Sequence, residues 1–516
     1  METLSSFLGG AWVKGAGEGS RLYDPTTDAV VAHASTDGLD LGAAFGYARA
    51  VGGPALRALT FAERGALLAA MSKAIHGQRE ALIEVGRING GNTRSDAKFD
   101  IDGATGTLMY YAGLGRELGG RRTLLDGDVI NLGASSRLAG QHLLVPRAGV
   151  AVHINAFNFP AWGLAEKAAC ALLAGMPVIA KPGTSTAMLT WAMVQAVVDA
   201  GVLPAGALSL VVGSARDLLD HVAPGDVVAF TGGAETATGL RGHRRVIEAG
   251  VPVNVEADSL NATILVPDAS DAAYDAFIRD VQREMTQKAG QKCTATRRIV
   301  VPRDRADDVV EDLSERLART VVGDPALESV QMGPLSSKAQ VDAARKGIAA
   351  LRAEAEVVFG DPDGGEVVGV EPGVGCFVTP LLLRAPNATG GDAVHRVEVF
   401  GPVSTVLPYD GSADDAVAAV RRGEGSLVCS MYGDDRNFLR SAIAGLAGWH
   451  GRIVVTDGKI ADKALAPGLV MPHLLHGGPG RAGGGEELGG LRGMRLYQQR
   501  CAVQGNGALL SRLLED

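Results

Sequence analysis

The spacing of hydrophobic positions changes several times along the chain. Residues 60–119 repeat apolar side chains at three- and four-residue steps, with charged side chains between them, which predicts amphipathic helices. Residues 1–50 hold short apolar runs separated by turn residues, which predict strands and hairpins. Residues 121–144 lose the helical period, so we expect an extended segment that leaves the body of the protein.

Apolar strand-like runs alternate with helical segments between Gly149 and Ala257, as in GVAVHIN, PVIAKP and VVAFTGG. Strands that are apolar nearly throughout and separated by helices are typical of a parallel, doubly wound sheet. Such sheets bind ligands at the carboxyl ends of their strands, where the segments NAFNFP, KPGTST and FTGG fall. A second alternation over residues 262–458 predicts another α/β domain.

A glycine-rich tract, HGGPGRAGGGEELGGLRG, follows, with nine glycines between Gly477 and Gly493. Two interpretations stay open: the backbone passes close to another part of the protein, or the tract is a flexible linker. The GxGxxG match over residues 478–483 lacks a flanking strand and helix, so we discount it as a dinucleotide motif.

Composition excludes several classes of protein. A chain of 516 residues is too long for a single core and is expected to form two or three domains. The net charge of −9, without a basic cluster, argues against nucleic acid or a membrane as the main partner. Five widely spaced cysteines without CxxC pairs argue against disulfides and a structural metal site. We see no signal peptide and no apolar run long enough to cross a bilayer, and expect a cytoplasmic protein.

A thiol and a carboxylate stand where catalytic groups are often found. Cys293 follows a helical segment in GQKCTATRR, and Glu256 ends the apolar run VNVE. A lone cysteine is usually a small core residue, but neighbouring Lys292, Arg297 and Arg298 could favour a nucleophilic thiolate. Glu256 is either a strand-end residue that reaches solvent or pairs in a salt bridge, or, with a pKa raised by apolar surroundings, a general base.

Polar groups at three further strand ends have two interpretations each. Asn158 in NAFNFP is either a turn or helix N-cap residue or an amide donor to a developing oxyanion. Lys181 in IAKPG is either a solvated lysine or a cation that meets a ribose or phosphate. The turn from Thr231 to Gly233 could admit a pyrophosphate at a helix N-terminus.

Taken in chain order, these motifs resemble those of NAD(P)-dependent aldehyde dehydrogenases. The matching segments are NFP at 158–160, KP at 181–182, FTG at 230–232, Glu256, GQKC ending at Cys293 and EVFGP at 398–402. The resemblance runs over almost the whole chain. HINAFNFP, VEADSLN, EMTQKAGQKCTA and HGGPGRAGGGEELGGLR are similar to a branch of this family that degrades aromatic compounds aerobically through CoA thioesters.

The resemblance implies a covalent mechanism without a metal. Cys293 would attack the aldehyde, while the Asn158 amide and the Cys293 backbone N–H hold the oxyanion. After hydride transfer to a nicotinamide, Glu256 would activate the water that hydrolyses the thioester. Lys167, in GLAEKAAC, matches a family lysine near that proton path.

A cofactor site is implied as well, with Lys181 at the adenosine ribose, Glu398 at the nicotinamide ribose and Phe400 packed beside it. The implied cofactor-binding residues are Phe157, Lys181, Pro182, Thr184, Thr231, Gly232, Gly233, Glu398 and Phe400.

Some positions depart from the family pattern. Many members have Glu where this chain has Thr184, and losing that carboxylate removes its repulsion of a 2′-phosphate, so NADP is expected, with NAD possible. Gly233 replaces a common Ser and Ala237 a glycine, which weakens the expected phosphate contact. His476 and Pro479 replace aromatic residues near the substrate tunnel and suggest a wider mouth.

The expected fold is that of the aldehyde dehydrogenases. A Rossmann-like cofactor domain would comprise residues 1–120 and 145–257, and a catalytic α/β domain residues 258–494. Residues 121–144 and 495–516 would form a small β oligomerisation element in a homodimer or homotetramer.

The resemblance implies a small-molecule aldehyde as the substrate, namely a CoA-linked semialdehyde. Three alternatives stay open: a general aldehyde dehydrogenase that does not act on CoA esters, an acylating enzyme, and a non-catalytic member. Glu256 argues against the acylating enzyme, because a base that activates water would waste the thioester. Retention of Cys293, Glu256 and Asn158 together argues against a non-catalytic member.

Overall fold

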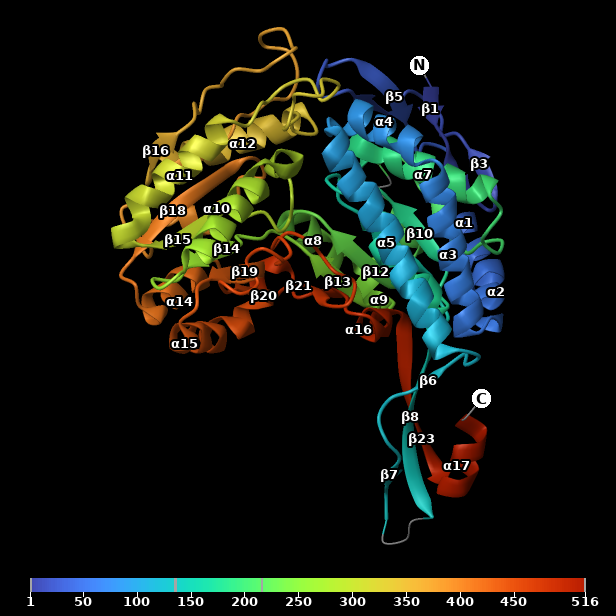
Figure 1. Cartoon of the computed structure of the whole chain (residues 1–516). Helices are drawn as coiled ribbons and strands as arrows, with labels where there is room; N and C mark the ends of the chain where they lie inside the picture. The colour runs from blue at the N-terminus through green and yellow to red at the C-terminus, as the bar shows by residue number, and fades with distance from the viewer. Residues whose placement is uncertain (1, 134–136, 215–216, 515–516) are drawn as a thin grey trace.

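The computed structural model describes residues 2–133, 137–214 and 217–514. Two seven-stranded sheets lie side by side, each between helices, and a β arm extends from them (Figure 1). The predicted α/β fold class is confirmed. Among the described residues, no helix is both long and apolar enough to span a membrane.

The first sheet has five parallel strands followed by an antiparallel hairpin at one edge. Alternate side chains of a strand enter different cores: Val178 and Ala180 face one, and Ile179 faces the other. Burial of both faces explains why these strands are apolar throughout. In spatial order the strands are β13 (Val253–Glu256), β12 (Val227–Thr231), β9 (Ala151–Ile154), β10 (Val178–Lys181), β11 (Leu208–Leu210), β2 (Ser6–Leu8) and β3 (Ala11–Val13).

The helices predicted over residues 60–119 are confirmed and pack against the first sheet. Thr60 starts the first of them through a reciprocal capping box with Glu63. One face of the sheet is covered by α3 (Phe61–Gly77), α4 (Arg79–Gly90), α5 (Arg94–Leu118), α6 (Trp162–Ala174) and α7 (Ala187–Asp199). The other core is closed by α1 (Leu41–Tyr47), the single-turn helix Leu218–His221 and α9 (Arg244–Glu248). A π-helical turn (Ala48–Gly52), α2 (Gly53–Ala58) and α8 (Ala234–Arg241) complete this region.

The second sheet is parallel except for its edge strand β16. Its strands, in spatial order, are β16 (Glu356–Phe359), β17 (Leu381–Arg384), β18 (Val403–Tyr409), β15 (Arg298–Pro302), β14 (Ala262–Leu265), β19 (Ser426–Tyr432) and β20 (His450–Thr456). Its helices are α10 (Asp271–Thr286), α11 (Ala306–Ala318), α12 (Lys338–Arg352), α13 (Ala393–Arg396), α14 (Ala413–Arg421) and α15 (Arg436–Leu446).

The N-terminal segment forms the strands and hairpins that its pattern predicts. Besides the β2–β3 hairpin, it contributes a separate small sheet to the body. That sheet consists of β1 (Glu2–Leu4), β5 (Val30–Ala34) and β4 (Ser20–Tyr23).

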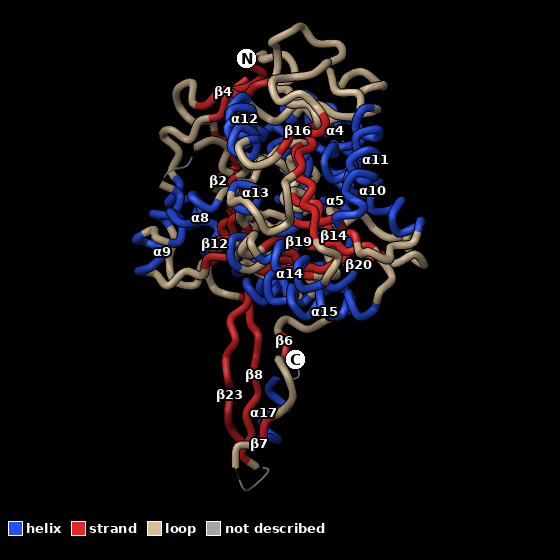
Figure 2. The backbone as a smooth tube through the Cα atoms, turned by 90° about the vertical axis from the view of Figure 1, so that its left-hand side faces the viewer, coloured by secondary structure: helices blue, strands red, loops and turns tan. Residues whose placement is uncertain are grey.

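The extended segment predicted over residues 121–144 belongs to the arm, which both Figure 1 and Figure 2 show leaving the body. Residues 134–136 of that segment, like 515–516 of the C-terminal part, lie outside the described residues. The arm is built on antiparallel pairing of β8 with β23 along their full lengths. Its elements are β6 (Leu124–Leu125), β7 (Ile130–Asn131), β8 (Leu138–Pro146), β23 (Gln498–Asn506) and α17 (Gly507–Leu514).

The glycine-rich tract is a packed part of the body, so its interpretation as a linker is wrong. It forms the β21–β22 hairpin (Leu475–Gly477 and Glu486–Leu488) and the short helix α16 (Leu491–Met494). A Cβ atom at Gly485 would lie 2.4 Å from the carbonyl oxygen of Val255, next to Glu256. The glycines therefore allow this backbone to lie directly against β13.

Candidate active site

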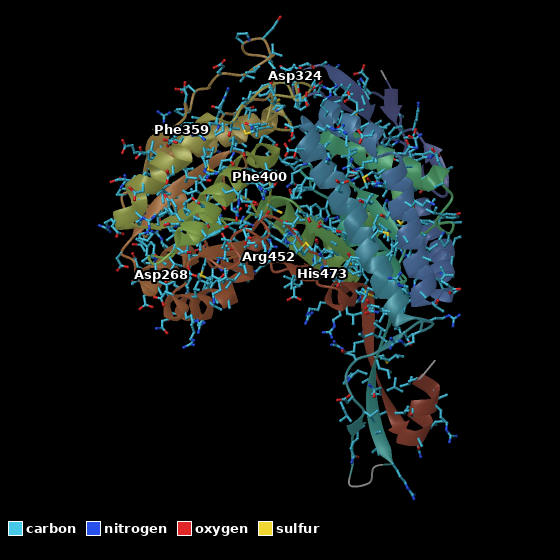
Figure 3. The ribbon with its side chains drawn as sticks, viewed as in Figure 1. Asp268, Asp324, Phe359, Phe400, Arg452 and His473 are labelled. Atoms are coloured by element: carbon cyan, nitrogen blue, oxygen red, sulfur yellow. The ribbon has the colours of Figure 1, made fainter. Side chains whose placement is uncertain are left out.

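Cys293, Glu256, Asn158 and Lys167 line one cavity, together with His476. They come from different elements, which meet where the two sheets adjoin. Glu256 ends β13, Asn158 follows β9, Lys167 lies on α6, Cys293 precedes β15 and His476 lies on β21. Figure 3 labels Phe400 near the junction of the two sheets, with Arg452 and His473 on the side from which the arm extends.

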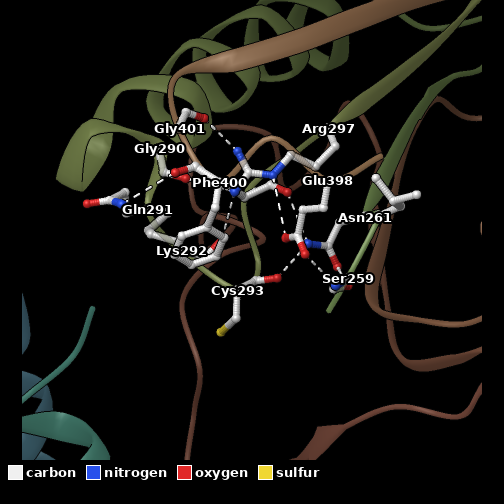
Figure 4. A network of polar contacts seen from close by, with 12 residues as sticks. Ser259, Asn261, Gly290, Gln291, Lys292, Cys293, Arg297, Glu398, Phe400 and Gly401 are labelled. Carbon is white, nitrogen blue, oxygen red and sulfur yellow. Dashed lines mark hydrogen bonds and ion pairs between the residues drawn. The ribbon is translucent and has the colours of Figure 1, made fainter. Parts of the chain in front are cut away.

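The loop that carries Cys293 is held by two side chains. Asn261 donates from Nδ2 to the carbonyl oxygens of Cys293 (2.7 Å) and Ala295 (3.0 Å). Arg297 donates to the carbonyl oxygens of Gly290 (2.8 Å), Lys292 (3.3 Å) and Gly401 (2.7 Å), as Figure 4 shows. The sequence analysis did not assign either role, although Asn261 ends the VEADSLN motif.

The backbone just before this loop is unusual. Helix α10 ends at Thr286, and Lys288 (φ 53°) and Ala289 (φ 51°) then adopt left-handed conformations. Two consecutive left-handed residues other than glycine are costly and persist only where surrounding contacts determine them. Gly290 (φ 68°) completes the turn, and its backbone packs so closely that a Cβ would lie 2.3 Å from Gly401 O.

The expectation that Lys292, Arg297 and Arg298 favour the thiolate is wrong. Lys292 pairs with Glu284 (Nζ–Oε2, 2.8 Å), and Arg297 lies 3.8 Å from a carboxylate oxygen of Glu398. Buried Arg298 donates to Leu260 O at 2.7 Å. Burial, and then the nearby Glu256 carboxylate, raise the pKa of the Cys293 thiol well above its ordinary value. The resting thiol is therefore protonated at neutral pH.

The expectation of a raised pKa at Glu256 is also wrong. Burial acts in that direction, but the His476 imidazole, through charge and hydrogen bonding, and then Lys167 outweigh it and lower the pKa. Nε2 of His476 lies 3.1 Å from Oε2 of Glu256 and 3.9 Å from Sγ of Cys293. Oε1 of Glu256 has no hydrogen-bond partner among the described residues.

His476 is a buried part of the cavity wall, and the expected wider mouth of the substrate tunnel stays a prediction. The imidazole is only 5% exposed and fills the space beside the nucleophile. Pro479 is absent from the cavity lining, and its carbonyl oxygen packs on Gly425. One sequence signal could have indicated the contact of His476 with Glu256: a histidine begins the tract whose glycines indicate close packing.

Asn158 is not the N-cap of α6. That helix begins at Trp162, and Asp100 from α5 accepts the N–H groups of Ala161 (3.3 Å) and Trp162 (2.8 Å). Asn158 instead donates from Nδ2 to Gln291 O at 3.1 Å, which leaves its second amide hydrogen for an oxygen in the cavity.

Lys167 is fully buried between two carboxylates. Its Nζ lies 2.9 Å from Glu166 and 3.0 Å from Glu487, and the sequence analysis identified neither partner. Burial alone would lower the pKa of Lys167, but these carboxylates raise it. Lys167 is therefore charged in this site.

The predicted adenosine-side residues lie at the ends of β10 and β12. Lys181 Nζ donates to Thr184 Oγ1 at 3.3 Å, and burial lowers the lysine pKa. The turn after Thr231 is tight, since a Cβ at Gly232 would lie 2.5 Å from the Phe230 ring. Pro182 is buried, and Gly233 directly precedes α8.

The start of α8 already holds a carboxylate. Asp258 accepts the N–H of Ala234, the first residue of the helix, at 3.1 Å. A pyrophosphate placed at this helix N-terminus, as the sequence suggested for Thr231 to Gly233, would therefore meet a like charge.

Arg297 lies beside both Glu398 and the Phe400 ring, and Phe400 in turn packs on Phe157. The two rings pack edge to face, with centroids 5.8 Å apart. Glu398 accepts the N–H of Ser259 through Oε2 at 3.0 Å, while its buried Oε1 lacks a hydrogen bond. Burial raises the pKa of Glu398 to about 7, against the opposing charge of Arg297.

Sequence comparison identifies proteins similar to this chain. The aldehyde dehydrogenase family pattern matches residues 12–494. The chain is 49% identical over 479 residues to 3,4-dehydroadipyl-CoA semialdehyde dehydrogenase of Aromatoleum evansii, which covers 92% of this chain and 93% of that protein. It is 28% identical to hydroxyisobutyraldehyde dehydrogenase of Mycolicibacterium austroafricanum, over 84% of this chain and 80% of the relative.

Solved structures share the fold. An aldehyde dehydrogenase from Bacillus cereus in complex with NAD⁺ superposes with a TM-score of 0.85 at 23% identity, covering 98% of this chain and 97% of that one. 3,6-Anhydro-L-galactose dehydrogenase in complex with NAP gives a TM-score of 0.84 at 22% identity, covering 98% and 100%. The ordered motifs, the fold and the match over most of its length all agree that this chain belongs to the aldehyde dehydrogenase family.

Proposed function

We propose that this protein oxidises a CoA-linked semialdehyde from aerobic aromatic degradation to the carboxylate, with NADP as the hydride acceptor. The observation that carries the proposal is the shared cavity of the Cys293 thiol, the Glu256 carboxylate and the Asn158 amide. The substrate class is supported by the name of the relative from Aromatoleum evansii, which acts on a CoA-linked semialdehyde.

The side chains divide the chemistry as follows. Glu256 takes the Cys293 proton through its free Oε1, and the sulfur attacks the aldehyde carbon. The Asn158 amide and the Cys293 backbone N–H then donate to the oxyanion. Glu256 then releases this proton to solvent, so that, once the acyl group is a thioester on Sγ, it can take a proton from the water that hydrolyses it. A thiol with a raised pKa makes this base necessary at neutral pH.

The residues around Glu398 fit a nicotinamide nucleotide. Its buried Oε1 lacks a donor, and a ribose hydroxyl would supply one. The buried Thr231 hydroxyl also lacks a hydrogen-bond partner among the described side chains. When bound, such a cofactor supplies the acceptor for the aldehyde hydride. Phe400 and Phe157 would hold the apolar side of the site, and Lys181 would meet the adenosine ribose.

Thr184 favours NADP over NAD. Its hydroxyl and the Lys181 ammonium lie 3.3 Å apart, so together they offer a donor and a cation to a 2′-phosphate. We expect Thr184→Glu to lower kcat/KM for NADP by at least about tenfold through like-charge repulsion, with a smaller effect for NAD. Steady-state kinetics with both cofactors checks this. A wild-type enzyme that prefers NAD would contradict the assignment.

The catalytic roles are tested with two substitutions at the nucleophile and base. We expect Cys293→Ala to bind NADP but to form no NADPH from any aldehyde, while Glu256→Gln gives a single burst of NADPH and then stalls as an acyl-enzyme. Stopped-flow absorbance and intact-protein mass spectrometry measure both outcomes. NADPH formation by Cys293→Ala, or sustained turnover by Glu256→Gln, would overturn the assignments.

The substrate class is tested by comparing kcat/KM for a CoA-linked semialdehyde with that for hexanal. We expect a clear preference for the CoA-linked compound. Equal values would instead indicate a general aldehyde dehydrogenase. Release of an acyl-CoA from free CoA and an aldehyde would indicate the acylating reaction, which the Glu256 carboxylate beside Cys293 disfavours.

A further inference from the structure

We propose that His476 is a positioning residue of this active site: its Nε2–H holds one oxygen of the Glu256 carboxylate, so that the other faces Cys293. The proposal rests on the oxidation assigned above and adds a group to it. His476 touches the base rather than the substrate, so it acts through Glu256.

The distances assign the imidazole proton to Glu256. Nε2 lies 3.1 Å from Oε2 of the carboxylate, a hydrogen-bond distance, and 3.9 Å from Sγ of Cys293, which is long even for sulfur. The single Nε2–H cannot donate to both groups, and the carboxylate of Glu256 is both nearer than the sulfur of Cys293 and the stronger acceptor. Oε1 of Glu256 is buried and has no hydrogen-bond partner among the described residues. His476 therefore binds one oxygen of Glu256, Oε2, and leaves the other, Oε1, free to accept a proton.

The backbone that carries His476 is fixed by close packing. A Cβ on Gly451 would lie 1.7 Å from Gly477 O, and a Cβ on Gly478 would lie 2.3 Å from Ser426 O. His476 pairs with Glu487 across the β21–β22 hairpin, so both side chains stand on the same face. Glu487 meets Lys167 at 3.0 Å from that face. One hairpin thus places a partner beside each of the two ionised groups, Glu256 and Lys167.

The surrounding charges show why Glu256 needs this partner. Besides His476, the titratable groups that act on it and on the imidazole are Lys167, Cys293, Glu166, Glu487 and Arg452. Burial disfavours an ionised carboxylate, and among these groups the imidazole gives the largest opposing contribution. Without His476 the pKa of Glu256 would rise, so at a given pH a larger fraction of the carboxylate would be protonated and unable to accept a proton.

The test compares three substitutions of His476. Gln can place its amide Nε2 near the position of the imidazole Nε2, Asn is one carbon too short to reach Glu256, and Phe has no donor. We expect kcat near pH 7 to fall by roughly 10- to 100-fold in Asn and Phe, with KM within about twofold, and by less than about fivefold in Gln.

The pH profile separates positioning from a structural role. In His476→Asn and His476→Phe, the acid limb of kcat should move to higher pH, because Glu256 loses the partner that favours its ionised form, and activity should recover as pH rises. Thermal melting and NADP affinity, measured on the same proteins, should stay near wild type. If Phe does not fold, the Gln and Asn pair still decides the question.

Two outcomes would overturn the proposal. If Asn and Phe keep the wild-type rate and acid limb, His476 does not position the base. If Gln is as slow as Asn, the imidazole itself moves a proton and is not merely a donor to Glu256. Failure of the proposed function is distinguishable from both, because it appears in the wild-type enzyme as an absence of aldehyde oxidation.

Discussion

Burial determines how the ionisable groups of the candidate site behave. Lys167 stays charged inside the protein because Glu166 and Glu487 lie within 3.0 Å of its ammonium. Glu487 shares that cation, yet burial still raises its pKa to about 7. A buried carboxylate that titrates near neutral pH and contacts a buried ammonium can take up or release a proton during turnover. At the scale of single residues, the buried ammonium and carboxylates of the site therefore neutralise one another in part.

Glu398 is expected to make cofactor binding depend on pH. Its pKa is about 7, because burial outweighs the attraction of Arg297, so the carboxylate ionises as pH rises through that value. Since the ionised form accepts hydrogen bonds better, we expect the Kd for NADP to fall several-fold between about pH 6 and about pH 8. Isothermal titration calorimetry measures this. Glu398→Gln should show a smaller change over this range, and an equal change in the two proteins would contradict the assignment.

The raised pKa of Glu398 also makes the stability of the folded protein depend on pH. Its folded pKa lies above the unfolded value, so the folded state binds the proton more strongly. The stability gained from the neutral carboxyl is complete below the unfolded pKa and is lost as pH rises through about 7. Denaturant unfolding across this range should show a smaller loss of stability with rising pH in Glu398→Gln than in wild type, because Glu487, whose pKa is also about 7, still titrates in both proteins.

At the scale of elements, the β21–β22 hairpin determines where His476 and Glu487 lie. Gly477 has φ 137° and sits so close to the opposite strand that a Cβ would lie 2.1 Å from Gly485 O. We expect Gly477→Ala to reduce the free energy of unfolding by about 1–3 kcal/mol and to lower kcat by at least about tenfold, because both side chains move. Denaturant unfolding and steady-state kinetics measure the two effects.

Gly448→Ala is the matched control for that substitution. A Cβ at Gly448 would have no neighbour within 4 Å, so stability and kcat should stay near wild type. If Gly477→Ala were as active and stable as this control, the hairpin would not be what places His476 and Glu487.

The hydrophobic periodicity of the sequence predicted the helices and strands that show a regular local pattern. It did not predict backbone conformations that depend on contacts with distant parts of the chain. The helices over residues 60–119 and the apolar parallel strands could be predicted, because each shows its period in its own sequence. The left-handed pair Lys288 and Ala289 could not, because such conformations are locally unfavourable and depend on packing around Gly290 and Gly401.

Side-chain partners were harder to predict than elements. Arg297 lies four residues after Cys293 in sequence, but its fork binds carbonyl groups and Glu398 rather than favouring the thiolate. His476 is 183 residues away in sequence from Cys293, and only the packed hairpin brings the two together. A single sequence gives no signal for that distance, although the glycine-rich tract did indicate close packing as one of two interpretations.

At the scale of the whole molecule, the arm exposes apolar side chains far from the body. Val129 is 63% exposed, Leu138 48% and Leu513 64%. The arm is a narrow sheet of β8 and β23, with two short strands and α17, and it extends away from the body. We therefore propose that the arm joins subunits into a homodimer or homotetramer, which would cover this apolar surface.

This proposal predicts that charge on the arm separates the subunits. We expect the double variant Val129→Asp, Leu513→Asp to shift the mass measured by size-exclusion chromatography with light scattering towards the monomer, because burying two carboxylates in an apolar interface is unfavourable. Leu327→Asp is the control, since Leu327 is 40% exposed in a loop of the body near Asp324, at the end of the molecule away from the arm in Figure 3. An unchanged mass in the double variant, or an equal shift in the control, would place the subunit contact elsewhere.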